Sequence, residues 1–176
     1  MSLYFDIMRE DHVELAWSFS VNPQKCDDPE VFKNQLIGAF GDMKSGNSVT
    51  HVFIDDSNNK KAIVGFVTLR ASAYLTQYPD DDNFNAKPAI EILCLAVDEK
   101  FEGKGIGTAL IKQAIIIADE LREKYIGVQY IVLRSNKKSL SFYKRKKIGF
   151  MKLSVIGKLA ADNWNKDCEP LIAKLP

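Results

Sequence analysis

Apolar residues recur along the chain with two different spacings, one typical of strands and one typical of helices. Residues 49–54 and 62–69 are rich in β-branched and aromatic side chains, and the turn-forming residues 55–59 separate them. This combination is typical of a β hairpin. Residues 89–97 are almost continuously apolar, which indicates a strand that is buried on both faces of a sheet.

Helical spacing of apolar residues indicates a helix that begins at Pro29, has Asp28 as its N-cap and ends near Gly41. A shorter helical stretch begins at Asp11, and a long acidic loop is expected over residues 75–88. The remaining predictions are strands at residues 3–8, 128–133, 150–156 and 171–175, and helices at residues 108–124 and 137–147. Because strands and helices alternate, the chain predicts an α/β fold with a mixed central sheet flanked by helices.

Composition narrows the class of protein. The chain has 176 residues, of which 46% are hydrophobic and 27% charged, so we expect one globular domain over residues 1–176. No apolar stretch is long enough to span a bilayer, and the N-terminus lacks the features of a signal peptide. Three cysteines form neither a disulfide framework nor a metal-binding cluster, which predicts a cytoplasmic protein with reduced thiols, no metal ion and no membrane partner.

Charge is distributed unevenly along the chain. The net charge is only +1, yet residues 124–161 contain no Asp or Glu and many Lys and Arg, whereas the first sixty residues are more acidic. A basic segment of this kind favours a phosphate-rich ligand locally but does not identify it.

A glycine-rich turn joins the apolar strand at residues 89–97 to the following helix. Gly103, Gly105 and Gly107 alternate there, and glycines at a helix start let the free backbone N–H groups approach an anion. A plain tight turn is the alternative. The turn does not fit the phosphate loop of nucleotide hydrolases, and a dinucleotide fingerprint would need glycine at the position of Thr108.

Two segments, in this order, match a pair of family motifs. Gly105 and Gly107 fit the pattern Arg/Gln-x-x-Gly-x-Gly/Ala, with Glu102 where Arg or Gln is usual. Residues 136–150 fit Asn-x-x-Ala-x-x-Phe-Tyr-x-x-x-Gly-Phe, with Ser139 in place of Ala and a longer helix end. On these motifs the chain resembles the GNAT superfamily of N-acetyltransferases, and the resemblance covers most of its length.

The resemblance implies an enzyme that uses acetyl-CoA, without a metal ion, to acetylate a primary amine by direct transfer. In the family the strand before the turn pairs with pantetheine through its backbone, and the turn holds the pyrophosphate. The cofactor-binding residues implied here are Leu95, Ala96, Val97, Glu102, Gly103, Lys104, Gly105, Ile106, Gly107, Thr108, Asn136 and Tyr143.

Tyr143 and Glu91 are the catalytic residues that the resemblance implies. Tyr143 would protonate the departing CoA thiolate, or it would only pack against aromatic neighbours. Glu91 would take the amine proton through a water molecule, or it would face solvent at a strand end. Asn136 fits either a CoA contact or a helix N-cap. Cys94 is interpreted as a small hydrophobic residue and not as an acyl carrier.

The acceptor amine is less well specified. A small-molecule or peptide amine is the main expectation, and a homodimer is left open. The N-terminal half also resembles the toxin-type branch that acetylates charged tRNA, through Phe19, Asp28, Phe32, Leu36 and residues 48–50 and 64–69. The third alternative is a non-catalytic CoA-sensing domain, which Glu102 and the longer helix end suggest.

Overall fold

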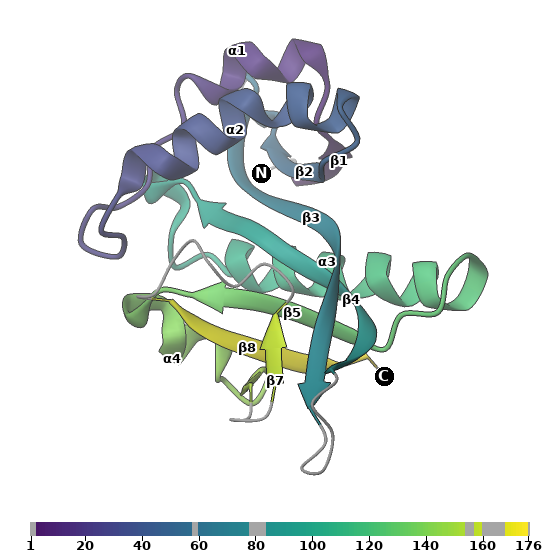
Figure 1. The fold of residues 1–176 in the computed structure, drawn as a ribbon. Coiled ribbons are helices and arrows are strands. Elements are labelled where there is room, and N and C mark those ends of the chain that lie inside the picture. The colour runs from purple at the N-terminus through teal and green to yellow at the C-terminus, as the bar shows by residue number, and fades with distance from the viewer. Residues whose placement is uncertain (1–2, 58–59, 78–83, 154–156, 160–167, 176) are drawn as a thin grey trace. The chain divides into compact units, whose positions relative to one another are not determined.

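The computed structural model describes residues 3–57, 60–77, 84–153, 157–159 and 168–175 (Figure 1). The chain forms two compact units. The first unit comprises Met1–Arg70 and Leu93–Lys112, and the second comprises Ala71–Ile92 and Gln113–Pro176.

The first unit begins with strand β1 (Leu3–Ile7), the 3₁₀ helix η1 (Glu10–His12) and helix α1 (Val13–Ala16). Helix α2 (Pro29–Lys44) and strands β2 (Val49–Asp55) and β3 (Ala62–Gln77) follow. Strand β4 (Phe84–Val97), the 3₁₀ helix η3 (Glu99–Phe101) and helix α3 (Ile106–Lys124) contribute their portions at residues 93–112. β1 and β3 pair antiparallel with β2, which confirms the predicted hairpin.

The core of the first unit lies between its strands and α1 and α2. Helix α2 packs against both α1 and β2 (Figure 1). Phe19 and Phe66 are 1% and 0% exposed, and their rings meet edge to face with centroids 5.4 Å apart. A Cβ on Gly65 would lie 3.0 Å from both Ile106 Cγ2 and Leu110 Cδ1, so this glycine permits the close approach of α3 to β3.

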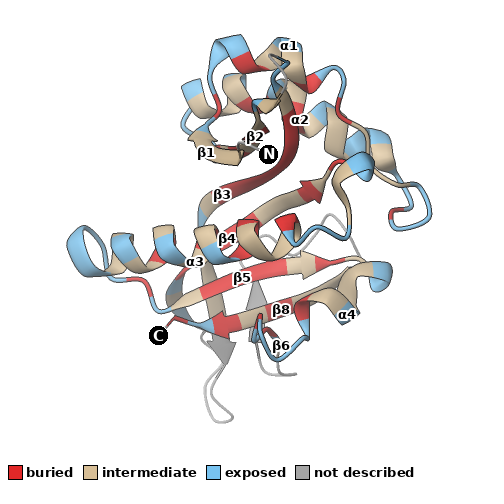
Figure 2. Cartoon of the chain, turned by 180° about the vertical axis from the view of Figure 1, so that it is seen from behind, coloured by how far each residue is buried: buried red, intermediate tan, exposed pale blue. Residues whose placement is uncertain are grey.

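The second unit adds β5 (Tyr130–Ser135), the 3₁₀ helix η4 (Lys137–Ser139) and helix α4 (Leu140–Tyr143). Strands β6 (Met151–Lys152), β7 (Gly157–Leu159) and β8 (Glu169–Lys174) complete it. β4 pairs parallel with β5, whereas β8 pairs antiparallel with β5 and β6, and β7 pairs antiparallel with β3. β5 is largely buried (Figure 2). The strands follow the order β1-β2-β3-β4-β5-β8-β6, so the predicted mixed α/β fold is confirmed.

Several predicted boundaries were wrong. Helix α2 continues past Gly41 to Lys44, and the Asp28 side chain makes no capping hydrogen bond. β3 and β4 extend into the predicted loop at residues 75–88, of which residues 78–83 lie outside the described residues. The predicted helix at residues 137–147 is only the 3₁₀ helix η4 and α4, which ends at Tyr143. Beyond it the chain forms a turn in which the N–H groups of Ile148 and Gly149 both donate to the Arg145 carbonyl, and Gly149 has a φ of +80°. The predicted strand at residues 150–156 is reduced to β6, and its residues 154–156 lie outside the described residues.

Candidate active site

Asp98 fixes the backbone where β4 leads into the glycine turn. Its backbone N–H donates to the Val64 carbonyl at 3.0 Å, and its carboxylate accepts from the backbone N–H groups of Lys100 at 3.0 Å and Ser20 at 3.1 Å. The residue is only 4% exposed. Sequence reasoning missed Asp98, although an aspartate directly after an apolar strand is a common N-cap signal.

The glycine turn has the backbone geometry of an anion site. Gly103 and Gly105 have φ angles of +75° and +83°, in the left-handed region that favours glycine. A Cβ on either would meet nothing within 4 Å, so the turn borders open space. The Ala109 N–H donates to the Gly105 carbonyl at 3.0 Å, which leaves the earlier N–H groups of α3 without an intrahelical acceptor. This donor set, at the positive end of a helix dipole, fits a pyrophosphate.

Two charged side chains at the turn, those of Lys104 and Glu102, contact neighbouring protein groups. Lys104 Nζ lies 4.6 Å from the Phe101 ring centroid and donates to the Lys100 carbonyl at 3.3 Å. Glu102 Oε2 accepts from Lys25 Nζ at 2.6 Å and from Asn22 Nδ2 at 3.3 Å. The unusual Glu102 is therefore matched by a cation from the loop that precedes α2.

The last residues of β4, which precede the turn, lie beyond the end of the β4–β5 pairing. The β4–β5 pairing runs from Ala89–Tyr130 to Ile92–Leu133. Leu95 and Val97 lie beyond it and are half-buried, whereas Ala96 is 6% exposed and belongs to the core of the first unit. Backbone pairing of Leu95 and Val97 with pantetheine stays a prediction that this geometry accommodates.

Glu91 is buried in the second unit. It is 2% exposed, and its Oε1 lies 3.9 Å from Nε of Arg134 on β5. The alternative that Glu91 is a solvent-facing strand-end residue is wrong, because β4 begins at Phe84 and Glu91 lies well inside it. A buried carboxylate needs a partner of opposite charge, and Arg134, which sequence reasoning missed, supplies it.

Tyr143 ends α4 and is 8% exposed. The centroid of its ring lies 5.0 Å from that of Phe142 and 6.0 Å from that of Phe150, with both rings edge-on. The packing alternative is therefore present, and the acid role of the phenol stays a prediction. Asn136 Oδ1 accepts from the Ser139 N–H at 2.7 Å, so Asn136 caps η4, and its contact with CoA stays a prediction.

Cys94 has the environment of a hydrophobic residue. Burial raises the pKa of the Cys94 thiol well above its ordinary range, and the charge of Cys26 acts in the same direction. A thiol with a raised pKa has little reactive thiolate, which agrees with the interpretation of Cys94 as a packing residue. Among the described residues, no group of three His, Cys, Asp or Glu side chains is placed to hold a metal ion.

The turn and the second motif lie in a chain whose residues 9–150 match the sequence model of the acetyltransferase (GNAT) family. The chain therefore belongs to the GNAT acetyltransferase family. It is an N-acetyltransferase, and acetyl-CoA is its acetyl donor. None of the curated protein sequences matches it. None of the helices in the described ranges is long and apolar enough to cross a membrane.

Solved structures show the same fold at low identity. AtaTR bound with AcCoA is 16% identical, with a TM-score of 0.76 over 98% of this chain and 94% of that one. A tyrosine-to-phenylalanine mutant of KacT is 14% identical, with a TM-score of 0.76 over 99% and 96% of the two chains. AtaT complexed with acetyl-methionyl-tRNAfMet is 16% identical, with a TM-score of 0.74 over 98% and 95%.

Proposed function

We propose that this acetyltransferase moves the acetyl group of acetyl-CoA directly to a primary amine. The observation that carries the proposal is the glycine turn. Its exposed backbone N–H groups lie at the start of α3, and the turn follows the strand that would pair with pantetheine. The new N–C bond forms as the C–S bond of the thioester breaks. Orientation of the two substrates would supply much of the rate.

Two buried side chains of the second unit would move the protons. The Glu91 carboxylate would accept the proton that the amine loses, through a water molecule, and Arg134 balances its charge. The Tyr143 phenol would donate a proton to the leaving thiolate and regain one from solvent. Glu91 and Tyr143 would thus act at opposite ends of the same transfer.

We also propose that the two units belong to one catalytic domain. Their boundaries cut through β3, β4 and α3, which each contribute residues to both units. The cofactor turn falls in the first unit, whereas Glu91, Asn136 and Tyr143 fall in the second. A cytoplasmic location and a homodimer stay predictions from the sequence.

Calorimetry and a turnover assay test the proposed function together. Acetyl-CoA should bind and raise the melting temperature, since it should engage only the folded state. Release of CoA thiol should then depend on an added amine, which a panel of small amines and peptides would identify. Absence of binding at millimolar acetyl-CoA would contradict the proposal, and binding without turnover would favour a CoA-sensing domain.

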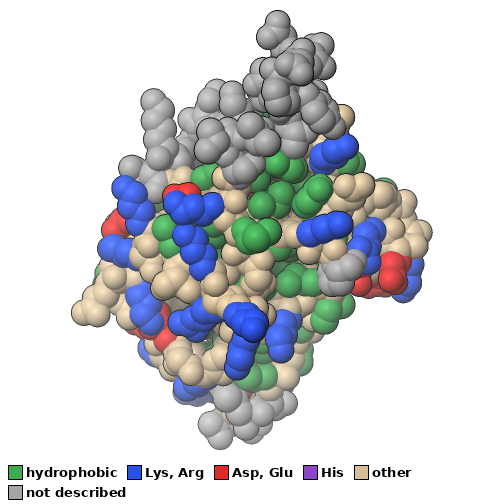
Figure 3. Space-filling view, turned by 90° about the horizontal axis from the view of Figure 1, so that it is seen from below, with side chains coloured by type: hydrophobic (Ala, Val, Ile, Leu, Met, Phe, Trp, Pro, Cys, Tyr) green, Lys and Arg blue, Asp and Glu red, His purple; other side chains and the backbone are tan. Residues whose placement is uncertain are grey.

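The α-amino group of an aminoacyl-tRNA is the second candidate acceptor. AtaT, which has the same fold, was solved with acetyl-methionyl-tRNAfMet. In this chain, exposed cations flank Tyr143 on both sides in the sequence: Lys137, Lys138, Lys144, Arg145, Lys146 and Lys147. Figure 3 shows a face on which Lys and Arg side chains prevail over Asp and Glu. Such a surface suits an RNA backbone.

Acetylation of charged tRNA tests this second candidate. The rate with aminoacyl-tRNA should exceed that with the free amino acid, and it should fall steeply with salt because phosphate contacts release counterions. Replacing Lys144, Arg145 and Lys146 together by Gln should remove that advantage. Equal rates with charged tRNA and free amino acid would instead favour a small-molecule amine.

A further inference from the structure

The loop before α2 is attached to the segment that leads into the cofactor turn. The Glu99 N–H donates to the Ser20 carbonyl at 2.9 Å, and the Ser20 hydroxyl donates to Glu99 Oε1 at 2.9 Å. The Ser20 N–H also reaches Asp98 at 3.1 Å. These bonds hold residues 20–25 beside residues 98–102, although the two segments are more than 70 residues apart in the sequence.

The last contact between the two segments is the ion pair of Lys25 with Glu102, the residue directly before the turn. Lys25 Nζ lies 2.6 Å from Glu102 Oε2, and the side chains of Lys25 and Glu102 are 63% and 22% exposed. Asn22 donates to the same oxygen at 3.3 Å. Because the next residue is Gly103, which opens the turn, Lys25 brings a positive charge to the edge of the proposed pyrophosphate site.

The turn needs such a charge. The carboxylate of Glu102 would repel a pyrophosphate bound to the neighbouring N–H groups. The Lys104 ammonium is placed over the Phe101 ring and donates to the Lys100 carbonyl, whereas the Lys25 ammonium lies directly against the Glu102 carboxylate. A lysine ammonium has three donor hydrogens, and one suffices for Glu102, so Lys25 retains donors for a phosphate oxygen.

We propose that Lys25 is a phosphate-binding residue of the acetyl-CoA site and that Glu102 positions it there. In this arrangement the pair replaces the single Arg or Gln that the motif usually carries at the position of Glu102. The inference rests on the proposed assignment of the turn to the pyrophosphate. Lys25 binds the pyrophosphate directly and does more than neutralise Glu102.

Binding affinities measured by calorimetry separate these two roles. Lys25→Met should weaken acetyl-CoA binding roughly tenfold, as expected for a lost charge-assisted hydrogen bond. A similar loss should follow when Lys25→Met is made in the Glu102→Gln background. The 3′-dephospho form of acetyl-CoA, which keeps the pyrophosphate, should show the same loss. Lys61→Met removes the same charge from an exposed site before β3 and should leave the affinity unchanged.

Several outcomes would overturn the inference. An unchanged affinity on Lys25→Met in the Glu102→Gln background would show that Lys25 only neutralises Glu102. A loss that disappears with 3′-dephospho-acetyl-CoA would move the contact to the 3′-phosphate. Thermal unfolding without ligand checks that the variants are folded, and a lowered melting temperature that accounts for the loss also counts against the inference. If the wild type itself fails to bind acetyl-CoA, the proposed function fails instead.

Discussion

Nε of Arg134 lies 3.9 Å from Oε1 of Glu91, and the two side chains are only 10% and 3% exposed. Their strands, β5 and β4, are parallel neighbours, so the ion pair joins two adjacent strands inside the second unit. A buried ion pair of this kind ties the proposed base to the stability of the fold, because either charge alone would be costly to bury.

The first prediction separates these two roles of Glu91. Glu91→Gln keeps the shape of the side chain but removes the proton acceptor, so turnover should fall by roughly a hundredfold or more, with little change in acetyl-CoA affinity. Steady-state kinetics and calorimetry measure the two quantities. A near-normal rate in Glu91→Gln would make the carboxylate purely structural.

Arg134→Met gives the second prediction. It leaves the Glu91 carboxylate buried without this partner, so the free energy of unfolding should fall by about 3 kcal/mol. Adding Glu91→Gln to Arg134→Met should restore part of that loss, since the buried carboxylate that lost the Arg134 charge is then neutral. Urea denaturation of the wild type, the two single variants and the double variant completes a double-mutant cycle. Strictly additive losses would mean that the two residues do not interact.

Tyr143→Phe should lower turnover more than it weakens acetyl-CoA binding. The ring contacts with Phe142 and Phe150 survive the change, and only the hydroxyl that would protonate the thiolate is lost. Tyr125→Phe is a matched control, because Tyr125 is 71% exposed in the same unit. Equal turnover in both variants would reduce Tyr143 to a packing residue.

Two glycines in the left-handed backbone region test the turn. Gly105 and Gly46 have φ angles of +83° and +71°, and a Cβ on either meets nothing within 4 Å. Gly105→Ala and Gly46→Ala should therefore each cost about 1 kcal/mol of stability. Only Gly105→Ala should also weaken acetyl-CoA binding, because its methyl group enters the space that the ligand approaches. Equal affinities in the two variants would contradict the assignment of the turn.

Sequence reasoning succeeded where the signal was local. The β2–β3 hairpin and the glycine turn are encoded in consecutive residues, and both are present. The partners of the site residues were missed, because Lys25 lies 77 residues from Glu102 and Arg134 lies on a different strand from Glu91. For Glu91 the sequence left two alternatives, a carboxylate within an apolar strand or a solvent-facing strand end, and the start of β4 at Phe84 together with the burial of Glu91 decides for the first. The end of α4 was mispredicted because the turn that follows it depends on the left-handed conformation of Gly149, which apolar spacing does not reveal.

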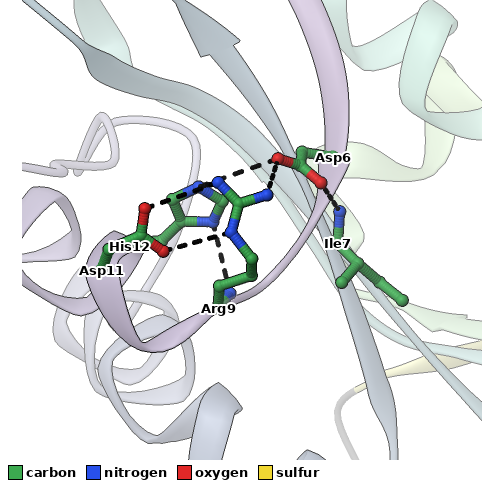
Figure 4. Close-up of polar contacts among 5 residues, drawn as sticks. All are labelled: Asp6, Ile7, Arg9, Asp11 and His12. Atoms are coloured by element: carbon green, nitrogen blue, oxygen red, sulfur yellow. Dashed lines mark hydrogen bonds and ion pairs between the residues drawn. The ribbon is translucent and has the colours of Figure 1, made fainter.

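A cluster around Arg9 gives a pH-dependent prediction (Figure 4). The Arg9 N–H donates to His12 Nδ1 at 3.3 Å, and Arg9 also pairs with Asp6 and Asp11. His12 is 2% exposed, and burial, aided by the charges of Arg9 and Lys61, lowers the pKa of its imidazole against the opposing effect of Asp6 and Asp11.

The unfolded chain should therefore bind a proton at His12 at a higher pH than the folded chain. Stability is fully present above the unfolded pKa of about 6.5 and is lost as the pH falls from there through the folded pKa. Burial also lowers the pKa of His51, so His51→Gln is the matched comparison. Urea denaturation between pH 5 and pH 7.5 should show a shallower dependence in His12→Gln than in the wild type. An unchanged dependence in His12→Gln, with a flat one in His51→Gln, would assign the whole effect to His51.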